Sequence, residues 1–415
     1  MKQLRNINLL LLSALLATSC SNEETPTPTI NPATDQEAVE LGITAGVALT
    51  KSAITGGNNV QTGEGADVMQ AIAVYALGNT TSYGGSVGNN YALYSQSSGS
   101  WTNNASSNTD KIFLTSEEAT IYAYHPAYTP DKTDHYMKNA DGGSALKVSS
   151  AFAATSTIPI TVFPGGEKQN DSEALKTQST IPATATGSAI LSAPGEVDYM
   201  WAIDGSTTTN STGENKQPTA SNGKQASGKP KADAHKVTLK MKHALSMVSF
   251  KIYKESNYTN TGTLTKIVLK NVSESQDADK VLATYATMTM KIADGTIETT
   301  STKSAATYTR YIGTSGTTIA GESDKDNAPK YSILVLPEKT SETAFDKSKV
   351  QVVFTIDGAE YAVPLAANTD NTTKWEAGNN YLYTAKLSGK ELSITSVTVQ
   401  AWEDGTVPND ELPVN

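Results

Sequence analysis

The stretch from Val39 to Lys51, VELGITAGVALTK, constrains the fold more than any other part of the chain. Apolar side chains occupy every second position, and the residues between them are small or polar. A period of two is typical of a β-strand that buries one face. The alternating positions are Val39, Leu41, Ile43, Ala45, Val47 and Leu49. This strand ends at a basic residue, Lys51, followed by Ser52.

Short apolar runs bounded by Gly, Ser, Asn and Pro continue along the chain, for example Ala71–Leu77, Thr120–Tyr124, Leu264–Leu269 and Val350–Ile356. Long windows with helical periodicity are missing, and only Asp277–Tyr285 hints at a short helix. This pattern is typical of antiparallel sandwiches. We therefore predict an all-β protein.

A chain of 415 residues is too long for one ordinary core, so two domains in series are expected. A polar stretch at 203–233, poor in apolar residues, is typical of a linker or long loop. We predict β-sandwich domains at 52–233 and 234–391. Residues 21–51 form a tether and first strand, and 392–415 form a C-terminal strand with an extension.

The first twenty residues are typical of an export signal. Lys2 and Arg5 precede an apolar run at Ile7–Leu16, and small residues precede the single cysteine, Cys20. The apolar run is shorter than the roughly 20 residues that cross a bilayer. The context of Cys20 resembles a bacterial lipobox, with Ala17 where Leu is usual, so we expect lipidation of its thiol. The alternative is ordinary secretion with a free thiol.

The composition disfavours several classes of function. The net charge is -10 and the body of the chain has no basic cluster, so no nucleic-acid partner is expected. His235 and His243 would lie about 26 Å apart on one strand, too far to share a metal. The calcium-loop likeness at Asp324–Asn327 lacks the Gly and Glu that such loops need. We predict no catalytic residues, no cofactor and no metal site.

The four tryptophans have two interpretations. They could form a platform for stacking sugars, or they could seed separate cores, and their scatter along different strands favours cores. These residues are Trp101, Trp201, Trp375 and Trp402.

Several motifs, in their order along the chain, together resemble the fimbrillins of Bacteroidetes, the pilin subunits of major and minor fimbriae. They are LLATSC, the strand ending at Lys51, AVYA at 73–76, YAYHPA at 122–127, DYMWA followed by VTLKMKHALSMVSFKI, GNNYLYTAKL and LSITSVTVQAW. The likeness runs over nearly the whole chain, although each motif alone is weak evidence for the family.

The resemblance implies two transthyretin-like β-sandwich domains and export as a lipoprotein to the outer membrane. It also implies loss of the first strand to a trypsin-like or arginine-specific protease, and assembly with other copies or other fimbrillins. On this chain the leaving strand is Val39–Leu49, and the scissile bond joins Lys51 to Ser52. Because well-known members are cut after Arg, Lys51 points to a lysine-accepting protease. Removal of a central strand would expose unpaired backbone groups and apolar pockets that a donor strand can fill.

The donor strand has two interpretations. Its candidate residues are Leu392, Ile394, Val397, Val399, Ala401 and Trp402, which alternate in two phases with a slip near Ser396 that indicates a bulge. In the first interpretation 392–414 is the donor for a neighbouring subunit. In the second, Leu392–Trp402 is the last strand of its own sandwich, and Pro408 and Pro413 favour that reading because proline removes ladder donors.

Three functions follow as hypotheses. The first is a structural pilin subunit of a cell-surface fimbria. The second is a tip adhesin or a glycan-binding surface lipoprotein that keeps its anchor. The third, a surface hydrolase, is disfavoured because the sequence offers no catalytic set.

Overall fold

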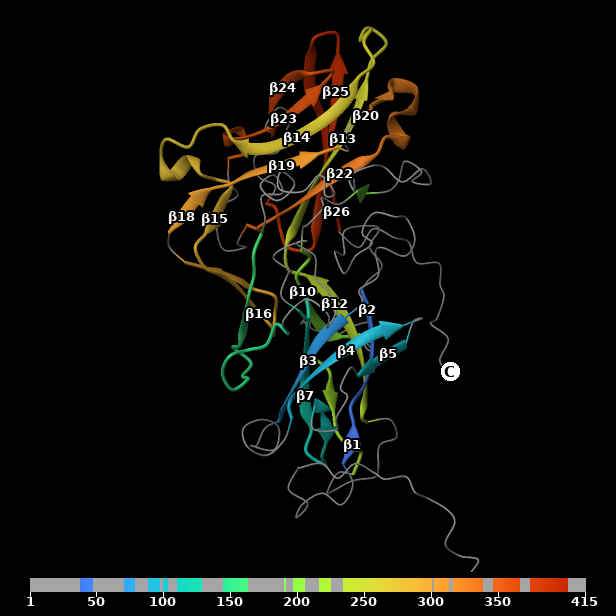
Figure 1. Cartoon of the computed structure of the whole chain (residues 1–415), viewed down its shortest axis with the longest axis vertical. Helices are drawn as coiled ribbons and strands as arrows, with labels where there is room; N and C mark the ends of the chain where they lie inside the picture. The colour runs from blue at the N-terminus through green and yellow to red at the C-terminus, as the bar shows by residue number, and fades with distance from the viewer. Residues whose placement is uncertain are drawn as a thin grey trace, which may run out of the picture.

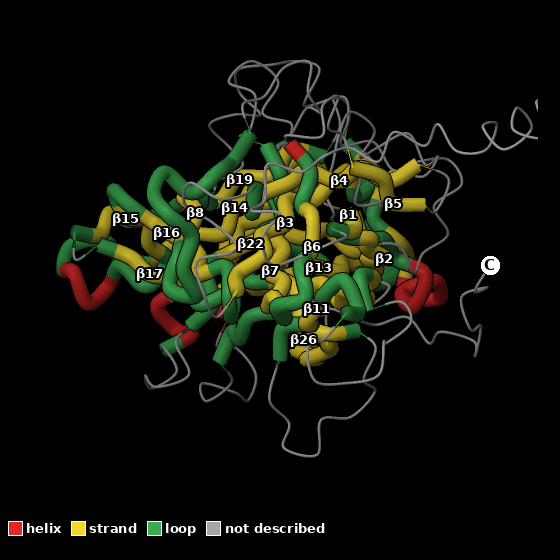
Figure 2. The backbone as a smooth tube through the Cα atoms, turned by 90° about the horizontal axis from the view of Figure 1, so that it is seen from below, coloured by secondary structure: helices red, strands yellow, loops and turns green. Residues whose placement is uncertain are grey.

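The computed structural model describes fourteen stretches of the chain and shows an almost entirely β architecture within them (Figures 1 and 2). Helical structure in these stretches is limited to short 3-10 turns. The all-β prediction is confirmed. The described residues are 38–47, 71–78, 89–97, 100–103, 110–128, 145–162, 190–191, 197–205, 216–224, 234–300, 302–312, 316–338, 346–365 and 374–401.

One sheet, which we call the N-terminal sheet, occupies the lower part of Figure 1. Its short alternating segments form strands because one face of each can be buried. The order is β2(Gly42–Val47), β12(Lys236–His243), β10(Met200–Asp204), β7(Ala119–His125), β3(Ala71–Gly78), β4(Tyr91–Ser97) and β5(Ser100–Asn103), with β11(Thr219–Ala220) paired to β7. Beside it, β1(Val39–Glu40) pairs with β6(Phe113–Leu114).

The two ends of the N-terminal sheet approach each other. Trp101 in β5 donates a hydrogen bond from Nε1 to the carbonyl of Ala45 in β2, at 2.8 Å. The sheet therefore curls around one core. β2 stands at the end of the hydrogen-bonded order, next to β12 alone, so the expectation of a central first strand was wrong. Sequence alternation shows that a face is buried, but it does not show how many neighbours a strand has.

The upper part of Figure 1 holds two further sheets that face each other, the C-terminal sandwich. Phe250 and Phe354, from opposite sheets, meet edge to face with ring centroids 5.7 Å apart. One sheet has the order β26(Glu391–Ala401), β25(Asn379–Ser388), β13(Ser246–Lys254), β22(Lys330–Val335) and β9(Ile190–Leu191), with β21(Ala320–Gly321) on β13. The other has β19(Thr307–Tyr311), β14(Thr263–Asn271), β23(Val350–Ile356) and β24(Ala359–Pro364), with β20(Thr317–Thr318) on β14.

Smaller elements join the two parts. β8(Thr157–Pro159) pairs with β16(Met288–Lys291), which also pairs with β17(Ile297–Thr299), and β15(Ala283–Tyr285) pairs with β18(Lys303–Ala305). At the β16–β17 turn, Gly295 has φ +70° and lies against the indole of Trp201 in β10, where a Cβ would come within 2.2 Å of the ring. Only glycine fits this approach.

The domain boundary predicted at 233–234 precedes β12. The chain leaves the N-terminal sheet only after His243, the last residue of β12.

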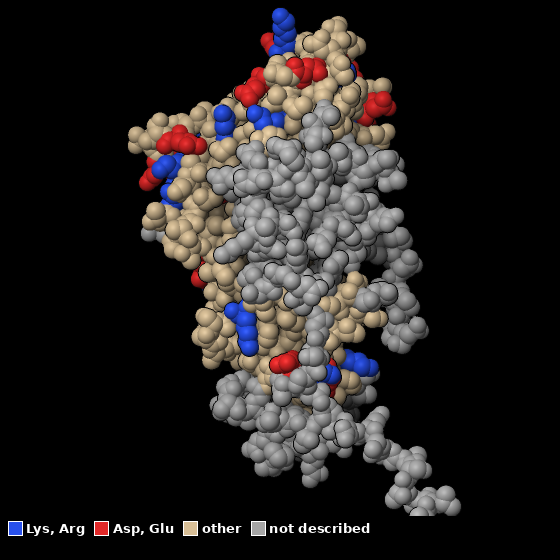
Figure 3. Space-filling model, in the orientation of Figure 1, with Lys and Arg blue, Asp and Glu red and all other residues tan. Residues whose placement is uncertain are grey.

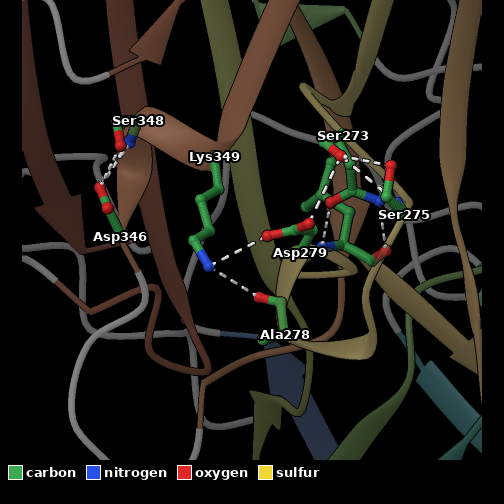
Figure 4. Close-up of polar contacts among 9 residues, drawn as sticks. Ser273, Ser275, Ala278, Asp279, Asp346, Ser348 and Lys349 are labelled. Carbon is green, nitrogen blue, oxygen red and sulfur yellow. Dashed lines mark hydrogen bonds and ion pairs between the residues drawn. The ribbon is translucent and has the colours of Figure 1, made fainter.

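Three 3-10 turns lie among the described residues: η2(Asp277–Asp279), η3(Glu322–Asn327) and η4(Lys347–Lys349). η2 starts the segment where a short helix was expected, but the segment continues into β15. Figure 4 shows Lys349 reaching from the end of η4 to η2, where its Nζ lies 3.1 Å from the carbonyl oxygen of Ala278 and 3.2 Å from Asp279 Oδ1. None of the described helical turns has the length and apolar character needed to cross a membrane.

Candidate functional site

The first strand is held by backbone hydrogen bonds on both sides of Leu41. Before it, β1 runs antiparallel to β6, and the Leu41 N–H donates to the carbonyl of Ile112 at 2.9 Å. After it, β2 runs parallel to β12 over six consecutive residue pairs, from Gly42 opposite Lys236 to Val47 opposite Met241. A single parallel ladder therefore fixes the register of β2.

Side chains of this segment enter the core of the N-terminal sheet. Leu41 is 1% exposed and Ile43 is 8% exposed, and half-buried Ala45 packs against the same core. Thr44 and Gly46, at alternate positions, are exposed. The core that receives these side chains contains Ile72, Val74, Ala92, Ile121, Val237, Leu239 and Met241. The segment thus completes a core contributed by the other strands of the N-terminal sheet and β6.

On the side away from β12, side chains contact the segment from Glu40 to Ala45. The Tyr94 hydroxyl donates to the carbonyl of Leu41 at 2.8 Å, and Trp101 binds the carbonyl of Ala45 as described above. Lys111 Nζ lies 2.8 Å from Glu40 Oε2. Burial, the largest cause, raises the pKa of Tyr94, so its hydroxyl keeps its proton as a donor at physiological pH.

The sequence predicted part of this site. Leu41, Ile43 and Ala45 come together in the core, Val39 is half-buried in β1, and Val47 ends β2. Cys20, Leu49, Lys51, Ser52 and Trp402 lie outside the described residues. Sequence reasoning missed Tyr94 and Lys111 entirely and noted Trp101 only as an aromatic residue. No local pattern marks them, because they reach β2 through long-range folding.

The candidate donor strand lies at an edge of the C-terminal sandwich. β26 pairs antiparallel with β25, and the ladder skips one residue: Ile394 stands opposite Ala385 and Ser396 opposite Thr384. Thr395 is the extra residue, so the predicted bulge near Ser396 is confirmed. Ile394 is buried, Leu392 and Val397 are half-buried, and Val399 is 48% exposed. The bulge brings both apolar phases to one face, and Ala401 closes the strand.

A buried polar cluster joins the strands near the passage between the two parts. His243 Nδ1 lies 2.8 Å from Asp198 Oδ2, and His125 Nδ1 lies 2.8 Å from the Asp198 carbonyl oxygen. Burial lowers the pKa of His125. The described residues contain no group of three or more His, Cys, Asp or Glu side chains able to hold a metal ion. Of these residues, His243 ends β12, two residues beyond the last pair of β12 with β2.

A cavity of about 890 Å³ opens between the two parts, lined among others by Trp201, Lys242, Lys280 and Trp375. Trp201 is 5% exposed and Trp375 is 1% exposed. Both indoles belong to one buried cluster, so these two tryptophans are core residues as predicted, but they share a core instead of seeding separate ones. On the described surface seen in Figure 3, acidic and basic side chains are intermixed.

Comparison with known families decides the identity. A model described as fimbrillin-like matches residues 168–402, more than half of the chain. The chain belongs to the fimbrillin-like family. This membership supports a pilin or adhesion role at the cell surface, in assembly with other fimbrillin subunits.

Solved structures that match the chain come from species of Bacteroides and Parabacteroides. A protein of Bacteroides uniformis proposed to act in cell adhesion is 17% identical, with 88% of this chain and 99% of that chain covered and a TM-score of 0.47. A fimbrial protein of Bacteroides vulgatus is 12% identical, with 88% and 99% covered and a TM-score of 0.44. A fimbrial assembly protein of Parabacteroides distasonis is 12% identical, with 88% and 99% covered and a TM-score of 0.33. No curated protein matches the chain.

Proposed function

We propose that the protein is a structural pilin subunit of a cell-surface fimbria. It is exported as a lipoprotein, activated by proteolysis after Lys51 and polymerised by donor-strand exchange. The observation that carries the proposal is the seating of β1 and β2. A segment that precedes Lys51 in the sequence supplies Leu41 and Ile43 to a core otherwise built by the other strands of the N-terminal sheet and β6.

The energetics of this segment suit exchange. Burying a Leu or Ile side chain contributes roughly 1.5–3 kcal/mol, so the vacated positions favour another apolar strand. Only one backbone ladder, with β12, holds β2. Release after cleavage breaks this ladder together with the short pairing of β1 with β6. The open edge of β12 then offers unpaired backbone groups to an incoming strand.

We propose 392–414 of a neighbouring copy as the donor. β26 is an edge strand, and among its described side chains only Ile394 is fully buried. Its release from β25 breaks a single ladder of ten residue pairs and withdraws Leu392, Ile394 and Val397 from the core of its own sandwich. The competing interpretation keeps β26 permanently as the last strand of its own sandwich. Head-to-tail exchange of one strand per joint produces an open filament rather than a closed dimer.

Cys20 and Lys51 act in sequence in this mechanism. Lipid on Cys20 holds the precursor in the outer membrane, and a trypsin-like or arginine/lysine-specific protease then frees the body from its anchor and its first strand together. Cleavage thereby couples release to activation. The family membership supports the pilin role to which these steps would lead.

Trypsin-like treatment of the full-length precursor tests the proposal. We expect cleavage after Lys51 followed by ladders that resist mild denaturant on gels. Lys51→Gln should block both, and Lys270→Gln, at a lysine retained in the body of the chain, should leave both unchanged. A wild-type protein that is cut after Lys51 and stays strictly monomeric contradicts the proposal.

The second candidate is a tip adhesin or glycan-binding lipoprotein that keeps its lipid anchor. The cavity of about 890 Å³ favours it, because ligand sites commonly have such volumes and lie between domains. This function requires a mature protein that still begins at lipidated Cys20. Glycan binding that is lost in a Lys242→Ala variant would support it over the pilin.

A further inference from the structure

The leaving strand and the C-terminal strand share a sequence motif. Glu40–Ala45 reads ELGITA, and Glu391–Ser396 reads ELSITS. Glu, Leu, Ile and Thr recur at the same spacing, and the two remaining positions hold small residues in both. The likeness concerns both faces of the strand, whereas simple alternation of apolar residues would preserve only one.

We infer the register of exchange from this match: the donor strand of a second copy replaces β1 and β2 residue for residue, with Leu392 in the place of Leu41 and Ile394 in that of Ile43. Lys111, Tyr94 and Trp101 would fix this register through their contacts with the donor strand. This inference rests on the proposed function and names the partner strand's alignment within it.

The apolar positions fit in size. Leu41 is 1% exposed and Ile43 is 8% exposed in the core, and Leu392 and Ile394 would restore the same side chains at the same positions. No change of volume arises at either pocket, so the donor avoids both the cavity and the overpacking that other residues would cause. Ser396 matches the small Ala45.

The two glycines of the leaving strand leave room for the donor's side chains. A Cβ at Gly42, where Ser393 would lie, comes 3.3 Å from Cγ of Lys236, a flexible side chain that can move. A Cβ at Gly46, where Val397 would lie, meets no atom within 4 Å. The groove that the leaving strand vacates therefore accommodates Ser393 and Val397, two positions at which the donor differs from the leaving strand.

Polar groups on the far side of β2 fix the alignment. Tyr94 and Trp101 bind the carbonyls of Leu41 and Ala45, four residues apart, and would bind those of Leu392 and Ser396. Lys111, now 2.8 Å from Glu40, would meet Glu391. Both carbonyls reach their donors only if the strand between them is regular.

A change in the donor's shape follows from this requirement. In its own sandwich β26 carries an extra residue at Thr395, whereas β2 pairs with β12 without interruption. The bulge must therefore straighten on transfer. Val397, which packs against the core of its own sandwich, would then take the outward-facing position of Gly46.

Disulfide trapping tests the register. In β2, Thr44 stands opposite Thr238 of β12, and both side chains are exposed, so Thr395 of the donor should stand there after exchange. Neighbouring strands place Cα atoms within the range that a disulfide spans. The full chain carries Cys20→Ser with Thr238→Cys and Thr395→Cys. The matched control carries Thr238→Cys and Ser393→Cys, an exposed position two residues out of register.

After trypsin-like cleavage and oxidation, we expect covalent ladders on non-reducing gels that are roughly tenfold stronger for the Thr395→Cys pair than for the control. Equal trapping, or stronger trapping of the Ser393→Cys pair, overturns the register while the polymer itself upholds the proposed function. If the cysteine-free parent forms no ladders after cleavage, the proposed function fails and the inference fails with it.

A charge exchange gives a second readout. Lys111→Glu and Glu391→Lys should each slow polymer growth by roughly two- to fivefold, as expected for a partly exposed ion pair, and the double variant should recover the original rate. Slowing in both single variants without recovery in the double variant overturns the role of Lys111.

Discussion

Replacing Leu41 by alanine should destabilise the precursor but not the mature polymer. Leu41 is 1% exposed in the core of the N-terminal sheet, and a buried Leu→Ala change costs about 2–5 kcal/mol. We expect the uncut protein to lose about 3 kcal/mol of unfolding free energy. The polymer formed after cleavage should keep its full stability, because the altered residue has left with the first strand.

Leu239→Ala provides the matched control. Leu239 lies in β12, is also 1% exposed and contacts the same core, but it stays in the mature chain. It should destabilise precursor and polymer alike, again by about 2–5 kcal/mol. Urea titration of uncut and cut protein, followed by intrinsic fluorescence, measures both states. The cut Leu41→Ala protein should also polymerise sooner, since about 3 kcal/mol corresponds to roughly a hundredfold faster loss of the cleaved strand.

Two results would refute this reasoning. In the first, Leu41→Ala lowers the stability of the uncut protein by less than about 1 kcal/mol, well below the cost of a buried leucine. In the second, it weakens the polymer as much as Leu239→Ala does. The second result would mean that the first strand remains in the mature subunit.

Three further predictions use other contacts. Trp101→Phe should cost the uncut protein about 1 kcal/mol in urea titration, because the hydrogen bond to Ala45 is lost; no change would exclude a role for that bond. Burial lowers the pKa of His125, so the unfolded state binds its proton first, and the melting temperature should fall as pH drops below about 6.5; His125→Gln should flatten this dependence, and an unchanged slope would contradict the assignment. Gly295→Ala should cost about 2 kcal/mol or more because a Cβ would strike a buried indole, whereas Gly358→Ala, with positive φ and open space, should cost about 1 kcal/mol; equal thermal shifts would contradict the contact.

Local periodicity predicted the strands but not their neighbours. The alternation from Val39 onward became β1 and β2 with Leu41 buried, and Ala71–Leu77 became β3. The pairing of β2 with β12, however, joins segments almost two hundred residues apart in the sequence, and it depends on folding of the whole chain. Alternation alone could not place β2 at the end of the sheet.

The candidate site was predictable on one side only. Apolar spacing identified Leu41 and Ile43, and the phase change near Ser396 identified the bulge in β26. The groups that hold the other side of the strand, Tyr94 and Lys111, sit in ordinary strand and loop contexts. Tyr94 binds the Leu41 carbonyl and Lys111 pairs with the Glu40 carboxylate. Such tertiary contacts produce no periodic pattern in the sequence.

The central claim is that the mature subunit has lost its first strand and carries another copy's strand in its place. N-terminal sequencing of subunits from purified surface filaments tests this claim most directly. We predict a mature sequence that begins at Ser52. Subunits that begin at lipidated Cys20 and retain Val39–Leu49 would contradict the account.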